Sequence, residues 1–211
     1  MSRFFQLAGL FLAAALVAHL AYVLLLPRMA ANALLAELHQ DLGGNVFHRL
    51  DGKWLRRIVR HPVPEAAYGV CVLQLKDHPV ELTGPDLRSQ WAVTVYSPRG
   101  DVVYAINDRL VPEGDVRIRF EYRALDSSMG EIALPKLKEK TLVLPLQQAS
   151  ALMLLEAWPW HPGQTPLVHR LMKRLRCHAV AATRPARSWP NAAAQKVPMP
   201  RPRPKRPAGV P

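Results

Sequence analysis

The chain has 211 residues, of which 28 are Lys or Arg and 16 are Asp or Glu, so its formal net charge is +12 at pH 7. Hydrophobic residues make up 49%, which is too many for a disordered chain, and the two cysteines exclude a disulfide-dense scaffold and a zinc site made of Cys alone. Without the apolar N-terminal stretch and the proline-rich end, about 150 residues remain, the size of one domain.

The positive charge is concentrated near the C-terminus. Residues 1–160 contain 17 Lys or Arg and 16 Asp or Glu, a net charge of +1. Residues 161–211 contain 11 Lys or Arg and no acidic residue. A nucleic-acid-binding domain usually carries its basic surface on the fold itself, so this distribution argues against nucleic acid as a partner.

The stretch from Phe4 to Leu26 contains no charged residue. As a helix it would be about 34 Å long, enough to cross a hydrocarbon core of about 30 Å. The sequence therefore predicts an N-terminal membrane anchor over residues 1–28, with Pro27 and Arg28 ending the span.

A cleaved secretory signal is the alternative to an anchor, and the triplet at 31–33 (Ala-Asn-Ala) offers a small-x-small cleavage site. The anchor is favoured, because the apolar region of a signal peptide is usually shorter than this stretch. A single N-terminal span ordinarily places the N-terminus inside and the following domain outside. The expected location is the inner (plasma) membrane, with a periplasmic domain.

Residues 29–62 are expected to form a helical linker. Ala30–Gln40 is rich in Ala and Leu, and two glycines at 43–44 should stop a helix there. A short amphipathic turn is expected at residues 53–60. Its favoured role is a solvated face beside the core rather than a contact with the membrane surface, because the segment is short.

Residues 63–180 are expected to form a mainly β domain, an antiparallel sandwich or an open barrel. Short runs rich in Val, Tyr, Leu and Thr alternate with turn clusters. The predicted strands are Tyr68–Leu75, Val80–Thr83, Gln90–Tyr96, Val102–Asn107, Val116–Tyr122, Thr141–Leu146 and Leu152–Trp158.

One helix is expected to pack on the sheet near the C-terminal end of this domain. Thr165 is suited to an N-cap and Pro166 to the first helical position. Five apolar residues follow at helical spacing, namely Leu167, Val168, Leu171, Met172 and Leu175. Residues 181–211, rich in Pro and Arg, are expected to form an extended, disordered tail.

The order of several residues resembles a known family. Residues 68–71 (Tyr-Gly-Val-Cys), 91–96 (Trp-Ala-Val-Thr-Val-Tyr), Gly100 and 105–109 (Ala-Ile-Asn-Asp-Arg) resemble the domain of unknown function 1254 (DUF1254). The likeness is greater to short bacterial proteins that carry this domain behind one membrane span and have a Cys that closes a late helix. The resemblance implies an uncharacterised protein of the cell envelope with a β-rich domain, and it brings no catalytic residues.

The sequence contains no signature of catalysis. It has no Gly-x-Ser-x-Gly, P-loop or Gly-x-Gly-x-x-Gly motif, so no cofactor is expected, and its eight histidines show no metal-ligand spacing. Asn107, Asp108 and Arg109 are interpreted first as a turn with a local ion pair. The alternative is the polar rim of a ligand site, with Trp91 and Tyr96 supplying stacking surface.

Two states are open for Cys71 and Cys177. In an oxidising periplasm they would form a disulfide from an early strand to the late helix, and in a reducing compartment they would be buried thiols. The disulfide is favoured, on the condition that the domain faces outward.

Three functions are compatible with these features. The favoured one is an envelope domain that works by binding or interaction, whose basic tail contacts anionic lipid, cell-wall polymer or a protein partner. The second is an envelope enzyme that acts on a small-molecule or cell-wall substrate. The third places the tail in the cytoplasm on nucleic acid, and it is disfavoured by the charge distribution.

Overall fold

The computed structural model describes residues 2–111, 114–123, 135–138 and 140–181. The described chain consists of a long N-terminal helix and a mainly β domain, as the sequence predicted. Most of the predicted basic tail, residues 182–211, lies outside the described residues.

The N-terminal helix α1 extends from Ser2 to Leu42. Its most apolar 18-residue window has a mean hydropathy of 2.3 and none of that window is buried, so α1 is long and apolar enough to cross a membrane. The helix does not end with the predicted span, because Pro27 lies inside α1. A proline removes one helical hydrogen bond, and good helix formers on both sides continue the helix across the gap.

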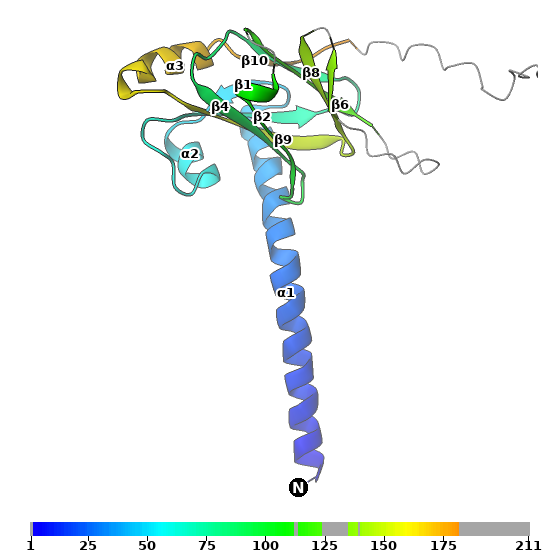
Figure 1. Cartoon of the computed structure of the whole chain (residues 1–211). Coiled ribbons are helices and arrows are strands. Elements are labelled where there is room, and N and C mark those ends of the chain that lie inside the picture. Colours follow the sequence, from blue (N-terminus) through cyan, green and yellow to red (C-terminus); the bar gives the residue numbers. More distant parts are fainter. Residues whose placement is uncertain (1, 112–113, 124–134, 139, 182–211) are drawn as a thin grey trace, which may run out of the picture. The chain divides into compact units, whose positions relative to one another are not determined.

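The described residues form ten strands, which make two five-stranded sheets. Sheet A has the order β1-β2-β9-β4-β5, and sheet B has the order β10-β3-β6-β8-β7. Figure 1 shows the strands and the helices around them. The strands of sheet A are β1 (Phe47–Arg49), β2 (Ala67–Gln74), β4 (Gln90–Tyr96), β5 (Val102–Asn107) and β9 (Ser150–Trp158). Those of sheet B are β3 (Val80–Gly84), β6 (Val116–Tyr122), β7 (Lys136–Lys138), β8 (Thr141–Leu146) and β10 (Arg176–Ala179).

The two sheets pack face to face around one apolar core. Alternate residues point into it, because successive side chains of a strand lie on opposite faces. In β4 the buried residues are Trp91, Val93 and Val95, and in β6 they are Val116, Ile118 and Phe120. At the β5 side the Tyr104 hydroxyl donates a hydrogen bond to the Pro145 carbonyl of β8 at 2.7 Å, which links the two sheets directly.

The outer face of sheet A is covered by the C-terminal part of α1. Leu35 and Leu38 pack against Val70 and Val72 of β2 and Leu154 of β9. Both faces of β2 and β9 are therefore buried, and their sequences are nearly continuous apolar runs.

A short helix, α2 (Gly52–Ile58), packs on the same cluster through Trp54, Leu55 and Ile58. The expected linker over residues 29–62 is thus part of the domain's packing. It is not helical throughout, because β1 forms the edge of sheet A beside β2.

Sheet B is mixed rather than purely antiparallel. β6 and β8 run parallel, while the other neighbouring pairs of this sheet are antiparallel. The chain between them, residues 123–140, is long enough for the return that a parallel pair needs. Pro145 fits in β8 because β7 pairs only with residues 141–143, so the missing N–H breaks no bond to β7.

The late helix α3 (Thr165–Met172) follows a 3-10 turn at Pro162–Gln164, and a second 3-10 turn lies at Asp108–Leu110. The N-cap is Gln164 rather than Thr165. Val168 and Met172 are buried, in agreement with the predicted apolar stripe. Cys177 does not close this helix but lies in β10, which pairs with β3.

Candidate functional site

The structure does not bring together the five residues of the predicted ligand surface. Trp91 and Tyr96 are five positions apart in β4, and residues an odd number apart point to opposite faces of a strand. Trp91 is buried in the core between the sheets, whereas Tyr96 packs on the outer cluster beside α1. The predicted pair of stacking aromatics is therefore wrong.

The polar members of that surface lie at the other end of β4 from Tyr96. Asn107 pairs with Ala92 in the register of β4 and β5, and it is exposed. Asp108 and Arg109 follow in a 3-10 turn, with Asp108 half-buried and Arg109 exposed. The interpretation of this segment as a turn agrees with the structure, but Asp108 and Arg109 form no ion pair among the described residues. A shared site with Trp91 and Tyr96 does not agree with the structure.

A pocket of about 200 Å³ lies between α1, α2 and the outer face of sheet A. We call it the helix-side pocket. Most of its lining is apolar, and Tyr96 and Ser97 bring its side-chain hydroxyls. The lining residues are Ala31, Leu34, Leu35, Ile58, Tyr96, Ser97, Gly100, Leu152 and Leu154.

Two ionisable residues on this face have shifted pKa values. Burial raises the pKa of Tyr96, the negative charge of Glu156 raises it further, and a hydrogen bond with Thr94 acts in the opposite direction. Burial also raises the pKa of Glu156, which lies two strand positions from the pocket residue Leu154. This outer face therefore favours uncharged groups, which suits an apolar or uncharged ligand more than a charged one.

A second pocket, of about 400 Å³, lies between α3 and the loops that precede β4 and β6. It differs from the helix-side pocket in being lined by charged residues of both signs. Its lining consists of Pro85, Asp86, Arg88, Asp115, Leu167, Leu171 and Arg174. One of these carboxylates is already used, because Asp86 accepts a hydrogen bond from the Arg88 backbone N–H at 2.8 Å.

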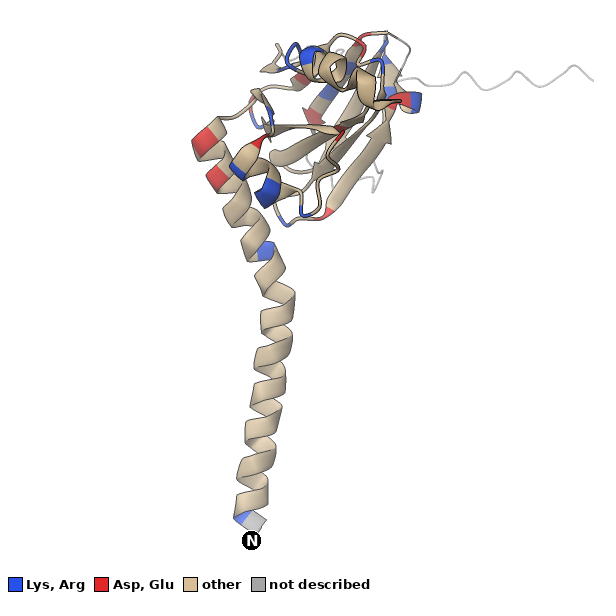
Figure 2. Ribbon diagram, turned by 90° about the vertical axis from the view of Figure 1, so that its left-hand side faces the viewer, with Lys and Arg blue, Asp and Glu red and all other residues tan. Residues whose placement is uncertain are grey.

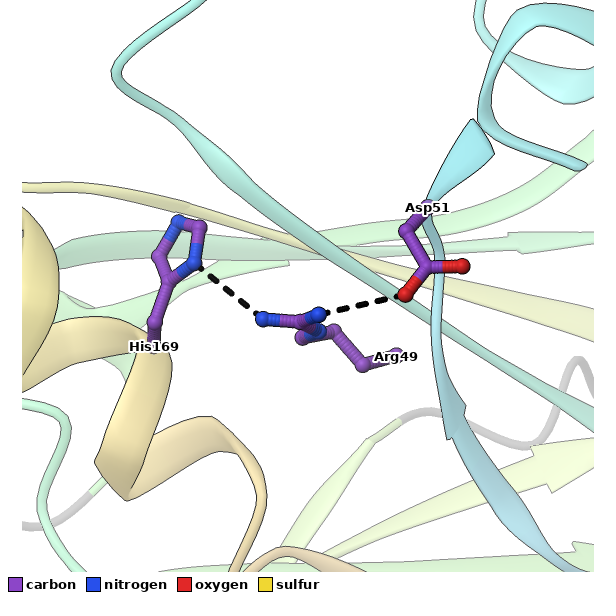
Figure 3. Close-up of polar contacts among 3 residues, drawn as sticks. All are labelled: Arg49, Asp51 and His169. Atoms are coloured by element: carbon purple, nitrogen blue, oxygen red, sulfur yellow. Dashed lines mark hydrogen bonds and ion pairs between the residues drawn. The ribbon is translucent and has the colours of Figure 1, made fainter. Parts of the chain in front are cut away.

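A polar cluster of Arg49, Asp51 and His169 joins β1 to α3 (Figure 3). Arg49 donates to the Nδ1 atom of His169 at 3.3 Å and forms an ion pair with Asp51 at 3.1 Å. Since Nδ1 accepts, the neutral ring carries its proton on Nε2, which is buried without a hydrogen-bond partner among the described residues. Arg49 and His169 are 120 positions apart, so no local pattern in the sequence indicated this contact.

The histidine of this cluster should make the domain sensitive to acid. Burial and the positive charges of Arg49 and Lys173 lower the pKa of His169 below its usual 6.5. The unfolded chain therefore binds this proton more tightly than the folded one, and stability falls as pH drops through 6.5 towards the lower folded-state value. We expect the loss of stability between pH 7 and 5, measured by urea unfolding, to be smaller in His169→Asn than in the wild type.

The matched control for this experiment is His178→Asn, on an exposed residue of β10. This variant should keep the wild-type dependence of stability on pH. Equal pH dependence in the wild type and His169→Asn would show that His169 does not contribute to it.

Cys71 and Cys177 are joined by a disulfide that spans 106 positions of the sequence. Cys71 lies in β2 of sheet A and Cys177 in β10 of sheet B, so the bond connects the two sheets rather than a strand and the helix. Both residues are buried in the core.

The described residues offer no group of three or more His, Cys, Asp or Glu side chains that could hold a metal ion. The features that remain as candidate sites are the helix-side pocket and the charged pocket beside α3.

Comparison with known proteins supports the fold and adds no function. No protein-family model and no curated protein matches the chain. The crystal structure of the VPA0106 protein from Vibrio parahaemolyticus matches with a TM-score of 0.51 and 10% identity, over 82% of this chain and 42% of that one. A putative uncharacterized protein from Burkholderia cenocepacia matches with a TM-score of 0.47 and 12% identity, over 71% of this chain and 38% of that one. The chain thus spans less than half of each of these two structures, and the likeness to the first is one of fold.

Proposed function

We propose that this chain is a single-pass membrane protein of the bacterial inner membrane that acts by binding, with its β domain on the periplasmic side. The observation that carries the proposal is α1, whose most apolar window has a mean hydropathy of 2.3 and no buried residue. A helix with apolar residues on every side and no protein packed on it is unfavourable in water and suited to a bilayer.

The disulfide supports a periplasmic position of the domain. Cys71 and Cys177 are bonded in the structure, and such bonds persist in oxidising compartments such as the periplasm. The C-terminal part of α1 packs on the same domain, so this domain and the end of α1 lie on one side of the membrane.

Binding is proposed over catalysis because of the lining of the helix-side pocket. Its hydroxyls come from Tyr96 and Ser97, and the rest of the lining is apolar except for backbone groups. Such a surface can hold an apolar group. The Ser97 hydroxyl donates to the Asp101 carboxylate at 3.3 Å, but the same oxygen also accepts the N–H groups of Arg99 and Asp101, so this contact stabilises the turn.

The second candidate function, an envelope enzyme, would use the charged pocket beside α3. Its two aspartates, Asp86 and Asp115, are of the type that serves in acid–base catalysis. This candidate would be supported if the protein turned over an envelope substrate and if Asp86→Asn and Asp115→Asn each abolished that turnover while the variants stayed folded.

Membership of the DUF1254 group is part of the same proposal. It rests on the residues between Tyr68 and Arg109, which form β2 to β5 and the turn after them.

Reporter fusions test the proposed topology. With alkaline phosphatase or green fluorescent protein fused after Ala181, we expect phosphatase activity and no fluorescence, because phosphatase is active only outside the cytoplasm and the fluorescent protein only inside. The chain should also stay in the membrane pellet after alkaline carbonate extraction. Fluorescence without phosphatase activity would reverse the proposed orientation, and release by carbonate would exclude an uncleaved anchor.

A further inference from the structure

The edge of the proposed membrane can be located on α1. The uncharged stretch ends at Leu26, and Figure 2 shows α1 without charged residues along that stretch. A bilayer is about 30 Å thick in its hydrocarbon core and about 40–45 Å with its headgroups, so each headgroup layer is about 5–8 Å deep. At a rise of about 1.5 Å per residue, this layer covers α1 from Pro27 to about Ala31.

The turn between β4 and β5 reaches the same level. A Cβ atom on Gly100 would lie 3.1 Å from the Cβ atom of Ala31, so the tip of this turn touches α1 one helical turn beyond Arg28. Gly100 has a φ of +87°, which favours glycine, and Ser97 accepts hydrogen bonds from the N–H groups of Arg99 and Asp101 at 3.1 and 3.2 Å. The turn therefore holds Arg99 beside the headgroup layer.

The C-terminal end of α2 lies near this level as well. Ile58 lines the helix-side pocket together with Ala31 and Gly100. The residue before it, Arg57, forms an ion pair with Glu37, which is six residues beyond Ala31 on α1. The C-terminal end of α2 therefore lies beside residues 31–37 of α1, and Arg60 follows Ile58 two positions later.

Several of the cations on this side have no acidic partner in the described part of the chain. Residues 53–61 contain four Lys or Arg and no acid. Arg57 pairs with Glu37, but Arg56 and Arg60 are exposed and belong to no ion pair, and the same is true of Arg28 and Arg99. Figure 2 shows both basic and acidic residues on the side of the domain from which α1 emerges.

We propose that this side of the domain binds the phosphate groups of anionic phospholipids through Arg28, Arg56, Arg60 and Arg99. We call these four residues the headgroup arginines. The inference rests on the proposed function, because α1 must span the bilayer to bring them to its surface. Guanidinium groups match phosphate oxygens in geometry and charge, and each cation near an anionic surface strengthens binding about fivefold (about 1 kcal/mol).

Arginine footprinting on the full-length protein tests the proposal without any substitution. The chain is reconstituted in nanodiscs of phosphatidylcholine alone or with phosphatidylglycerol, treated with phenylglyoxal, and digested for mass spectrometry. We expect the headgroup arginines to react at least about threefold more slowly in the anionic nanodiscs, because bound phosphate shields them. Arg117 of β6 and Arg174 after α3, both exposed, are the internal controls and should react equally in both.

Two further arms separate the sources of protection. Inorganic phosphate added to phosphatidylcholine nanodiscs should not protect the headgroup arginines from phenylglyoxal. In the anionic nanodiscs, about 1 M salt, where the Debye length is about 3 Å, should remove their protection. Equal reactivity of the headgroup arginines in both nanodiscs would overturn the proposal, as would protection by free phosphate alone. If the protein co-elutes with the nanodiscs, either result contradicts only the binding of lipid phosphate and is compatible with the membrane span. A protein that does not co-elute with the nanodiscs would contradict the proposed function itself.

A charge-removal variant provides a second, independent measurement. Hydrogen exchange of residues 52–61 should be slower in anionic than in zwitterionic nanodiscs for the wild type. This difference should vanish in Arg56→Gln/Arg60→Gln/Arg99→Gln. The control variant, Lys136→Gln/Lys138→Gln, removes exposed cations from β7. It should keep the difference in hydrogen exchange between the two kinds of nanodisc. A lipid effect that survives in the triple variant would exclude these arginines as its cause.

Discussion

Replacing Cys71 and Cys177 together with alanine should lower the free energy of unfolding of the domain by about 2–5 kcal/mol. The bond spans 106 positions, and a cross-link over a long loop removes many conformations from the unfolded chain. Both side chains are also buried, at 0% and 5% exposure, so their removal leaves unfilled space in the core. The measurement is urea unfolding of the detergent-solubilised full chain, followed by tryptophan fluorescence.

Reduction provides the control for this prediction. Dithiothreitol should destabilise the wild type and have no further effect on the double variant, because that variant has no disulfide left. The disulfide would be contradicted by two observations on the wild type together. The unfolding midpoint would not change with the reductant, and two thiols would react with a maleimide after denaturation without reductant.

Two arginines in the middle of the apolar stretch should prevent stable membrane insertion. Leu12 and Leu16 are exposed on α1 and lie one helical turn apart. Arginine at the centre of a span costs about 2.5–3.5 kcal/mol on the insertion scale, so Leu12→Arg/Leu16→Arg should cost about 5–7 kcal/mol. We expect the double variant to be extracted by alkaline carbonate while the wild type stays in the pellet.

The matched control places the same charges on α1 beyond the proposed span. Asn32 and Ala36 are also exposed and one turn apart, so Asn32→Arg/Ala36→Arg should remain in the pellet. If both double variants behave like the wild type, α1 does not insert as proposed.

The main strands could be predicted from the sequence because each carries its own signal. Gln90–Tyr96 and Val116–Tyr122 alternate buried residues with half-buried or exposed ones, and turn clusters bound them, so their limits are as predicted. The strands that were missed, β1, β7 and β10, have three or four residues each. Such short strands are determined by the neighbour they pair with rather than by a pattern of their own. The path of α1 through Pro27 was missed for a related reason, because a proline marks a boundary only on average.

The candidate site was less predictable than the fold. The spacing of Trp91 and Tyr96 already placed them on opposite faces of one strand, so strand periodicity alone could have excluded them as a stacking pair. The helix-side pocket is different, because it combines residues of α1, α2, β4 and β9 that meet only after the outer face of sheet A is covered. The contact of Arg49 with His169 has no sequence signal for the same reason.

The disulfide also changes what a protease can release. Every strand of the described residues except β1 lies wholly or partly between Cys71 and Cys177, and the bond closes this segment into a ring. One cut anywhere in the ring leaves both pieces covalently joined, and both stay attached to α1. A nicked protein would therefore migrate as one chain without reductant and as two with it. Release of the domain from the proposed membrane anchor requires a cut before Cys71.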